Sequence, residues 1–131
     1  MRITTNTTYA VRCMVYLLNR RGETSSLRDV AGGTALPPNY LSKILRGLGR
    51  HGLIKSRKGR NGGYKLGRAP DSISLNDILL ATSGGGSVLK MKCGAGAERC
   101  GFHKNCKVRG VWLDVGRIVG TYLSSCKLTR F

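Results

Sequence analysis

The chain has 131 residues, which is enough for one compact domain and an appendage. Its 23 lysines and arginines outnumber its 6 aspartates and glutamates, and the formal net charge of +17 favours a polyanionic partner. The scattered acidic residues and the lack of a phosphate-cradling loop argue against an enzyme. The sequence holds no apolar run of about 18 residues, and its polar start lacks the apolar core of a secretion signal, so we expect a cytoplasmic protein.

The first third of the chain predicts two helices. Residues 5–20 place apolar side chains at helical spacing, and the cations of Arg20-Arg21 suit the helix C-terminus that Gly22 ends. The capping-box pattern Ser26-Leu27-Arg28-Asp29 predicts a second, shorter helix. Gly32-Gly33 ends it and provides a short turn toward the next element.

Residues 38–50 predict an amphipathic third helix. Pro37 and Pro38 favour its start, because a proline in the first turn removes no intrahelical hydrogen bond. One face carries apolar residues at i, i+3, i+4 and i+7, namely Leu41, Ile44, Leu45 and Leu48. The opposite face is polar and basic, and it consists of Asn39, Ser42, Lys43, Arg46 and Arg50.

A basic β-hairpin is expected after the third helix. Two strand-like runs, within 53–67, flank the turn signal Asn61-Gly62. Between Val30 and Pro70 there are nine lysines and arginines and no acidic residue. A helix, a short turn, a basic helix and a basic hairpin form the order of a winged helix-turn-helix, in which the helix enters a major groove and the hairpin reaches a minor groove.

The rest of the chain predicts a short helix at 74–82, a Ser/Gly-rich break at 83–87 and a long helix at 107–126. The long helix has a broad apolar stripe formed by Val108, Val111, Trp112, Val115, Ile118, Val119, Tyr122 and Leu123. Because this stripe is broad for one small domain to cover, we favour pairing with a second copy over packing within one chain. The expected organisation is a DNA-binding domain at 1–82, a cysteine-rich loop at 83–107 and a dimerisation helix at 108–131.

Three of the five cysteines, Cys93, Cys100 and Cys106, lie within fourteen residues. An odd number of cysteines in a cytoplasmic setting argues against a disulfide framework. Thiolates are the usual ligands of iron–sulfur clusters, and the neighbouring lysines and arginines favour the thiolate form. A zinc site with His103 as a nitrogen ligand and a metal-free thiol switch are the alternatives, although the Cys-x-x-Cys pairs of many zinc sites are absent.

The opening run MRITTNTTYAVRCMVYLL, the wing GRNGGYKLG and the three cysteines ahead of a Trp-bearing helix resemble the Rrf-type family of bacterial winged-helix regulators. The resemblance covers nearly the whole chain and implies a mainly α fold with a small β-hairpin wing. It also implies a homodimeric transcription regulator, usually a repressor, that binds a palindromic operator. In one branch of the family three loop cysteines hold an iron–sulfur cluster that tunes DNA binding, and another branch lacks these cysteines. This chain resembles the cluster-binding branch.

The resemblance leaves the fourth cluster ligand open. The positions that match a histidine and an aspartate ligand of the family are Arg109 and Thr8, so neither ligand carries over. His103, Cys13 and a small exogenous ligand are the candidates, although Cys13 on an apolar helix face also fits a buried structural residue, and Cys126 is expected to be structural. We favour a 4Fe–4S cluster over a 2Fe–2S cluster, in a sensor of nitric oxide, redox state or iron and cluster supply.

The expected DNA contacts combine residue chemistry with the resemblance. Arginine or lysine can bind guanine, and asparagine can bind adenine. Lys58 matches a minor-groove arginine of the family, and Tyr40 and Tyr64 are expected to pack rather than to stack on bases. A protein that coats any duplex without selecting sequence is the alternative. The expected contacts are Asn39, Ser42, Lys43 and Arg46 to bases, Arg50 to phosphate, and Lys58, Arg60 and Asn61 from the wing.

Overall fold

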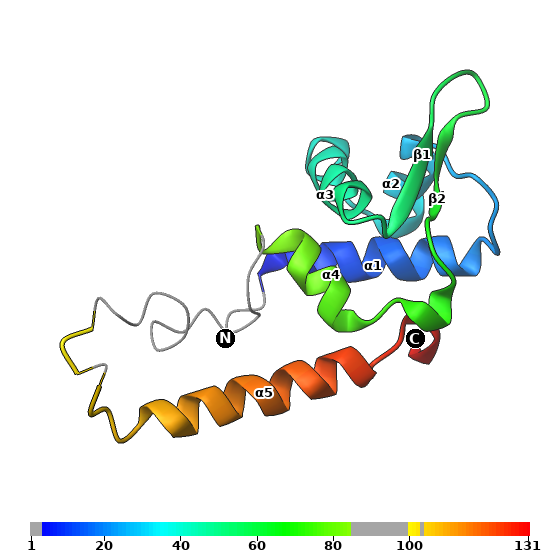
Figure 1. The fold of residues 1–131 in the computed structure, drawn as a ribbon. Coiled ribbons are helices and arrows are strands. Elements are labelled where there is room, and N and C mark those ends of the chain that lie inside the picture. The colour runs from blue at the N-terminus through cyan, green and yellow to red at the C-terminus, as the bar shows by residue number, and fades with distance from the viewer. Residues whose placement is uncertain (1–3, 85–99, 103) are drawn as a thin grey trace.

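The computed structural model describes residues 4–84, 100–102 and 104–131 (Figure 1). Within these ranges a mainly α fold with one small hairpin is confirmed, and the expected bounds are met within two residues. The helices are α1 (Thr5–Asn19), α2 (Leu27–Thr34), α3 (Pro38–Arg50), α4 (Leu75–Thr82) and α5 (Arg109–Ser125). The strands are β1 (Ile54–Arg57) and β2 (Gly63–Leu66), and short 3-10 turns lie at Pro70–Ser72 and Leu128–Arg130. No described helix is long and apolar enough to cross a membrane.

Side-chain caps explain where three of the helices begin. The Thr4 hydroxyl accepts a hydrogen bond from the first turn of α1. Ser26 and Asp29 form a reciprocal capping box at α2, with the amide of Ser26 donating to the Asp29 carboxylate at 2.9 Å. Ser74 and Asp77 form the same box at α4, at 2.8 Å. The hydroxyl and amide of Ser26 lower the pKa of Asp29, because both hydrogen bonds favour the carboxylate.

The wing differs from the expected hairpin in its turn. β1 pairs antiparallel with β2, with Arg57 opposite Gly63, so the loop runs over 58–62. The amide of Gly62 donates to the carbonyl of Gly59 at 3.0 Å, and Asn61 keeps a negative φ. The prediction of a tight turn at Asn61-Gly62 is therefore wrong, because that turn type needs a positive φ at its first central residue. Arg60 and Asn61 instead occupy the tip of the wing.

The wing is also attached to the segment before α2. Ser25 forms an isolated antiparallel bridge with Tyr64, with amide-to-carbonyl distances of 2.9 and 2.7 Å. This contact explains the second glycine of the wing: Gly63 has a φ of 152°, and a Cβ there would overlap the backbone of Ser25. The bridge fixes the base of the wing beside the start of α2.

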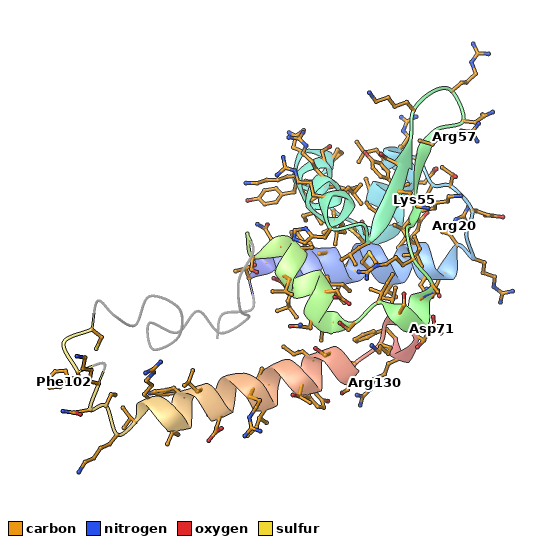
Figure 2. All side chains as sticks on the ribbon, viewed as in Figure 1. Arg20, Lys55, Arg57, Asp71, Phe102 and Arg130 are labelled. Atoms are coloured by element: carbon orange, nitrogen blue, oxygen red, sulfur yellow. The ribbon has the colours of Figure 1, made fainter. Side chains whose placement is uncertain are left out.

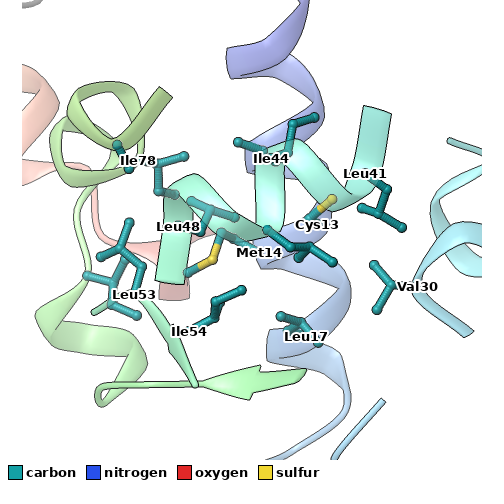
Figure 3. Close-up of a cluster of buried hydrophobic side chains, with 14 of the residues drawn as sticks. Cys13, Met14, Leu17, Val30, Leu41, Ile44, Leu48, Leu53, Ile54 and Ile78 are labelled. Carbon is teal, nitrogen blue, oxygen red and sulfur yellow. The ribbon is translucent and has the colours of Figure 1, made fainter. Parts of the chain in front are cut away.

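The core lies between α1, α2, α3, α4 and the base of the wing (Figure 3). The apolar stripe of α3 faces inward, and its four residues are at most 4% exposed. Cys13 and Met14 of α1 lie in the same cluster. The largest fully buried side chains are Met14, Leu17, Leu41, Leu45, Leu48, Leu53, Ile73, Ile78 and Leu128.

α5 leaves this core as an arm, with the wing on the opposite side of the molecule (Figure 1). Its C-terminal end is fixed by backbone hydrogen bonds: the amide of Leu75 donates to the carbonyl of Cys126, and the amide of Leu128 donates to the carbonyl of Ile73, both at 2.8 Å. Leu128 is fully buried. In the described chain, none of the residues of α5 itself is buried. The short pairing of 126–128 with 73–75 therefore attaches the arm to the start of α4.

Candidate nucleic-acid interface

The outer face of α3 presents the polar and basic residues that the sequence analysis singled out. Because the apolar stripe is buried, Asn39, Lys43, Arg46 and Arg50 are exposed. Ser42 is half-buried, and its hydroxyl donates to the carbonyl of Pro38 at 3.1 Å. The proton of that hydroxyl is thus already used, and its oxygen lone pairs stay available to a donor on a base.

The wing continues this basic surface away from the core (Figure 2). Lys58, Arg60 and Asn61 are all exposed. The structure also places Lys55 directly opposite Lys65 in the hairpin, an arrangement of like charges that costs stability. Among the described residues, ion pairs join only Arg20 to Glu23 and Arg117 to Asp114, so no cation of α3 or the wing is neutralised by a carboxylate there.

A groove of about 700 Å³ separates α3 from β1. Its walls carry both cations and hydroxyls, which are the groups that bind phosphate oxygens. Lys55, Ser56 and Tyr64 line it, and sequence reasoning missed all three as site residues. β1 offered no alternating pattern that would have marked them, because its burial runs from one buried residue to three exposed ones, and only the packing of the hairpin against α3 places them here. The lining residues are Ser42, Leu45, Arg46, Gly49, Ile54, Lys55, Ser56 and Tyr64.

A smaller hollow of about 380 Å³ lies on the other side of α3. Lys43, Arg46 and Arg50 line it together with Asn6 of α1 and Thr82 of α4. The Thr82 hydroxyl is 3.1 Å from the hydroxyl of Thr7, which links the end of α4 to the start of α1. Cations therefore line hollows on both flanks of α3, as expected of a helix that lies between two phosphate backbones.

The described cysteines fall into two groups. Cys100 is exposed and Cys106 half-buried, both just before α5, whereas Cys93 and His103 lie outside the described residues. Cys13 is fully buried, and this burial raises its pKa to about 12, although the charge of Arg12 acts in the opposite direction. Cys126 is also buried, and Nη1 of Arg130 donates to its sulfur at 3.5 Å. Burial keeps Cys13 a neutral thiol, which fits a structural residue better than a metal ligand.

The two positions that match the family's fourth ligands are both described. Thr8 is exposed in the first turns of α1, and Arg109 is half-buried as the first residue of α5. Neither side chain is an iron ligand of the usual thiolate, imidazole or carboxylate type. The donors that fit an iron–sulfur group are therefore the loop thiols, of which Cys100 and Cys106 are described and both precede α5 in the chain.

A third feature is apolar and lies away from the basic surface. A groove of about 710 Å³ runs between α1, α4 and α5. Val11 of α1, Leu79 of α4, and Ile118 and Tyr122 of α5 are among its lining residues. Ile118 is 64% exposed and Tyr122 58% exposed, so this face of α5 is largely uncovered in the single chain.

A basic helix packed behind a short turn and followed by a basic hairpin defines a winged helix-turn-helix DNA-binding protein. The chain belongs to the Rrf2 family, whose model, described as an iron-dependent transcriptional regulator, matches residues 3–131. It is therefore a DNA-binding transcription regulator and not an enzyme.

Individual relatives carry different regulator names. NsrR of Bacillus licheniformis is 31% identical over 83 residues, covering 63% of this chain and 58% of that protein. IscR of Erwinia tasmaniensis is 31% identical over 132 residues, covering 99% of this chain and 78% of that protein. The structure of CymR, the global cysteine regulator of B. subtilis, superposes with a TM-score of 0.75 at 29% identity, covering 98% of this chain and 94% of that one. The chain thus spans little more than half of one relative and most of the others.

Proposed function

We propose that this chain is a homodimeric repressor that reads a palindromic operator with α3 and the wing, and that an iron–sulfur cluster controls the binding. The observation that carries the DNA-reading part is the uncompensated positive surface of α3 and the wing. Asn39, Ser42, Lys43 and Arg46 meet base edges in the major groove, and Arg50 meets phosphate. Lys58, Arg60 and Asn61 enter the adjacent minor groove.

The geometry of the wing supports this assignment. Arg60 and Asn61 occupy the tip of the hairpin, and the groove between α3 and β1 leaves room for the backbone between the two DNA grooves. The opposed Lys55 and Lys65 cost stability in the free protein, and a nearby phosphate would offset that repulsion. The proposal therefore adds Lys55 and Ser56 to the expected phosphate contacts.

The uncovered stripe of α5 supports the dimer. Two copies that pair through α5 would bury side chains such as Ile118 and Tyr122 and set the distance between two reading heads. The division into a DNA-binding domain at 1–82, a cysteine-rich loop at 83–107 and a dimerisation helix at 108–131 follows from this arrangement. The high exposed fractions of the apolar side chains on α5 are the observation that supports a separate dimerisation helix.

Cys93, Cys100 and Cys106 would hold the cluster, because three thiols form a soft donor set suited to iron–sulfur chemistry. When bound, the group supplies iron that reacts with nitric oxide or oxygen and responds to iron supply. A 4Fe–4S cluster is favoured, with His103, Cys13 or an exogenous molecule as the fourth ligand. Cys100 and Cys106 lie directly before α5, so the state of the loop would bear on the start of that helix. The same loop without a cluster would be a thiol switch or a zinc site.

The wing proposal predicts that Lys58→Ala or Arg60→Ala weakens operator binding. Each substitution removes one cation from the DNA contact, so each should also reduce the slope of log affinity against log salt by about 1. Gel shifts at several salt concentrations measure both effects. Lys127→Ala removes an exposed cation on the side away from the wing and serves as the control. Unchanged affinity and slope in both wing variants would remove the wing from the interface.

The cluster proposal predicts a brown protein after anaerobic purification, with iron, sulfide and visible absorption. Cys93→Ala, Cys100→Ala and Cys106→Ala should each lose most of the iron, because each removes one of three protein thiolates. Cys126→Ala should keep it, because that thiol is buried beside Arg130. Cys13→Ala decides whether the core thiol is the fourth ligand.

Operator gel shifts before and after addition of nitric oxide test whether the cluster controls DNA binding. A colourless protein that retains zinc or no metal would favour the zinc or thiol-switch function instead.

A further inference from the structure

α3, the helix proposed to enter the major groove, starts without a side-chain cap. Thr4, Ser26 and Ser74 each cap the first turn of a helix in the described chain, but the N-cap of α3 is Pro37, whose side chain makes no such hydrogen bond. An uncapped first turn frays more readily than a capped one. Asn39, a proposed base contact, lies in this first turn. Something other than a cap must therefore hold it in place.

An aromatic contact lies at this position. Tyr40, in the first turn of α3, meets Tyr9 of α1 edge to face, with ring centroids 6.4 Å apart and the ring planes at 87°. Tyr9 is half-buried against the core, whereas Tyr40 is 55% exposed. Edge-to-face pairs at such distances are attractive beyond the area that they bury. Besides the buried contacts of the core, α1 thus contacts the first turn of α3 through this ring pair.

Arg12 extends the contact to the turn before α3. Its guanidinium carbon lies 5.9 Å from the centroid of the Tyr9 ring, and its Nη1 donates to the carbonyl of Thr34 at 3.4 Å. Thr34 ends α2, and the next residue, Ala35, has a φ of 54°, which is unfavourable for a residue with a Cβ. One arginine on α1 therefore touches the end of α2 and the ring that holds α3.

We infer that Tyr9 and Arg12 are positioning residues for sequence reading, acting on the start of α3 through Tyr40 without touching DNA themselves. This inference rests on the proposed DNA-reading function. Base contacts tolerate displacements of only about 0.5 Å, whereas lysine and arginine contacts to phosphate adapt through flexible side chains. Loss of the Tyr9–Tyr40 contact therefore lowers sequence selectivity more than general affinity for DNA.

The test uses the full chain and a duplex that wild-type protein enriches from a random pool, with a scrambled duplex of the same composition as reference. Tyr40→Leu and Tyr9→Leu should each reduce the ratio of the two affinities about three- to tenfold, with an unchanged salt slope. Tyr40→Phe and Tyr9→Phe keep the rings and should retain the wild-type ratio. Thermal unfolding identifies any variant that fails to fold.

The double variant Tyr9→Leu/Tyr40→Leu decides the mechanism. If the two residues act through their contact, it should lose no more selectivity than the worse single variant. Additive losses of selectivity, or a loss in Tyr40→Phe, would mean that Tyr40 binds DNA directly and would overturn the inference.

If Tyr9→Leu does not fold, Arg12→Met replaces it in the same double-variant comparison with Tyr40→Leu, and the same criterion applies. A wild-type chain that enriches no duplex would refute the proposed function, whereas a selective wild type with equally selective variants would refute only the positioning role.

Discussion

α3 and α5 carry the same kind of apolar stripe, but the stripe of α3 is buried and that of α5 is exposed. Leu48 of α3 is fully buried and Ile44 is 4% exposed, whereas Val111 and Ile118 of α5 are 62% and 64% exposed. Helical periodicity predicts a helix and the face on which its apolar side chains gather. It does not identify what covers that face. Because the stripe of α5 is uncovered in the single chain, we propose that a second protein surface covers it.

The two helices also differ in how they are held. α3 packs against α1, α2, α4 and β1, so its orientation is fixed from several directions. α5 is attached near its C-terminal end by the backbone pairing at Ile73 and Leu128, and its other end carries the cysteine-rich loop (Figure 1). Among the described residues α5 contributes no buried side chain to the core, whereas α3 contributes four. The proposed function uses this contrast, with α3 held in place for DNA contact and α5 available for pairing with a second copy.

The largest expected effect compares the same substitution in both regions. Leu48→Ala removes a fully buried side chain from the core and should lower the free energy of unfolding by about 2–5 kcal/mol. Leu113→Ala on α5, where the side chain is 43% exposed, should change it by about 0.5 kcal/mol or less. Urea unfolding at low protein concentration measures both. Similar losses in the two variants would mean that α5 shares the core of the single chain.

The second prediction tests what covers α5. Ile118→Glu places a charge on the stripe of both copies and should raise the dimer dissociation constant about a hundredfold or more, because each buried isoleucine contributes about 1.5–3 kcal/mol. Ser124→Glu, at an exposed position outside the stripe, is the matched control. Analytical ultracentrifugation over a concentration series gives the constants. A wild-type chain that stays monomeric, or an Ile118→Glu chain that dimerises like wild type, would contradict pairing through this face.

The smallest expected effect is at the capping box that starts α4, where the chain after α5 pairs with the core. Burial raises the pKa of Asp77, but the hydrogen bonds from the amide and hydroxyl of Ser74 outweigh it, and the net pKa is lowered. The lowered pKa means that this carboxylate stabilises the fold above about pH 4 and loses that effect as the pH falls through its folded pKa. Ser74→Ala should cost about 1 kcal/mol at neutral pH.

Asp77→Asn provides the pH test of that box. The variant should be less stable than wild type at pH 7, and the difference should shrink as the pH is lowered below about 4, where wild-type Asp77 becomes protonated. Asp71→Asn, an exposed carboxylate outside any capping box, is the control. Urea unfolding at a series of pH values gives the comparison. A difference that stays constant with pH would show that the charge of Asp77 does not contribute.

Local patterns were sufficient for much of the fold. The capping boxes at Ser26 and Ser74, the stripe of α3 and the long α5 all involve residues within about four positions of each other, which is the range over which helix signals act. The turn of the wing was predicted wrongly from Asn61-Gly62. The turn closes between Gly59 and Gly62 instead, with positive φ at Gly59 and at Gly63, and the base of the wing pairs with Ser25, a residue far away in the chain.

The sequence by itself determined the positive charge, the helices, the basic face of α3 and the clustering of thiols before α5, because composition and short-range periodicity are properties of the chain alone. Only the tertiary structure decided that Lys55 and Ser56 line a groove beside α3, that Cys13 lies in the core, that Tyr9 meets Tyr40 and that α5 remains uncovered. Each of these depends on which surfaces meet after folding. That outcome follows from the packing of distant segments, and a linear pattern does not specify it.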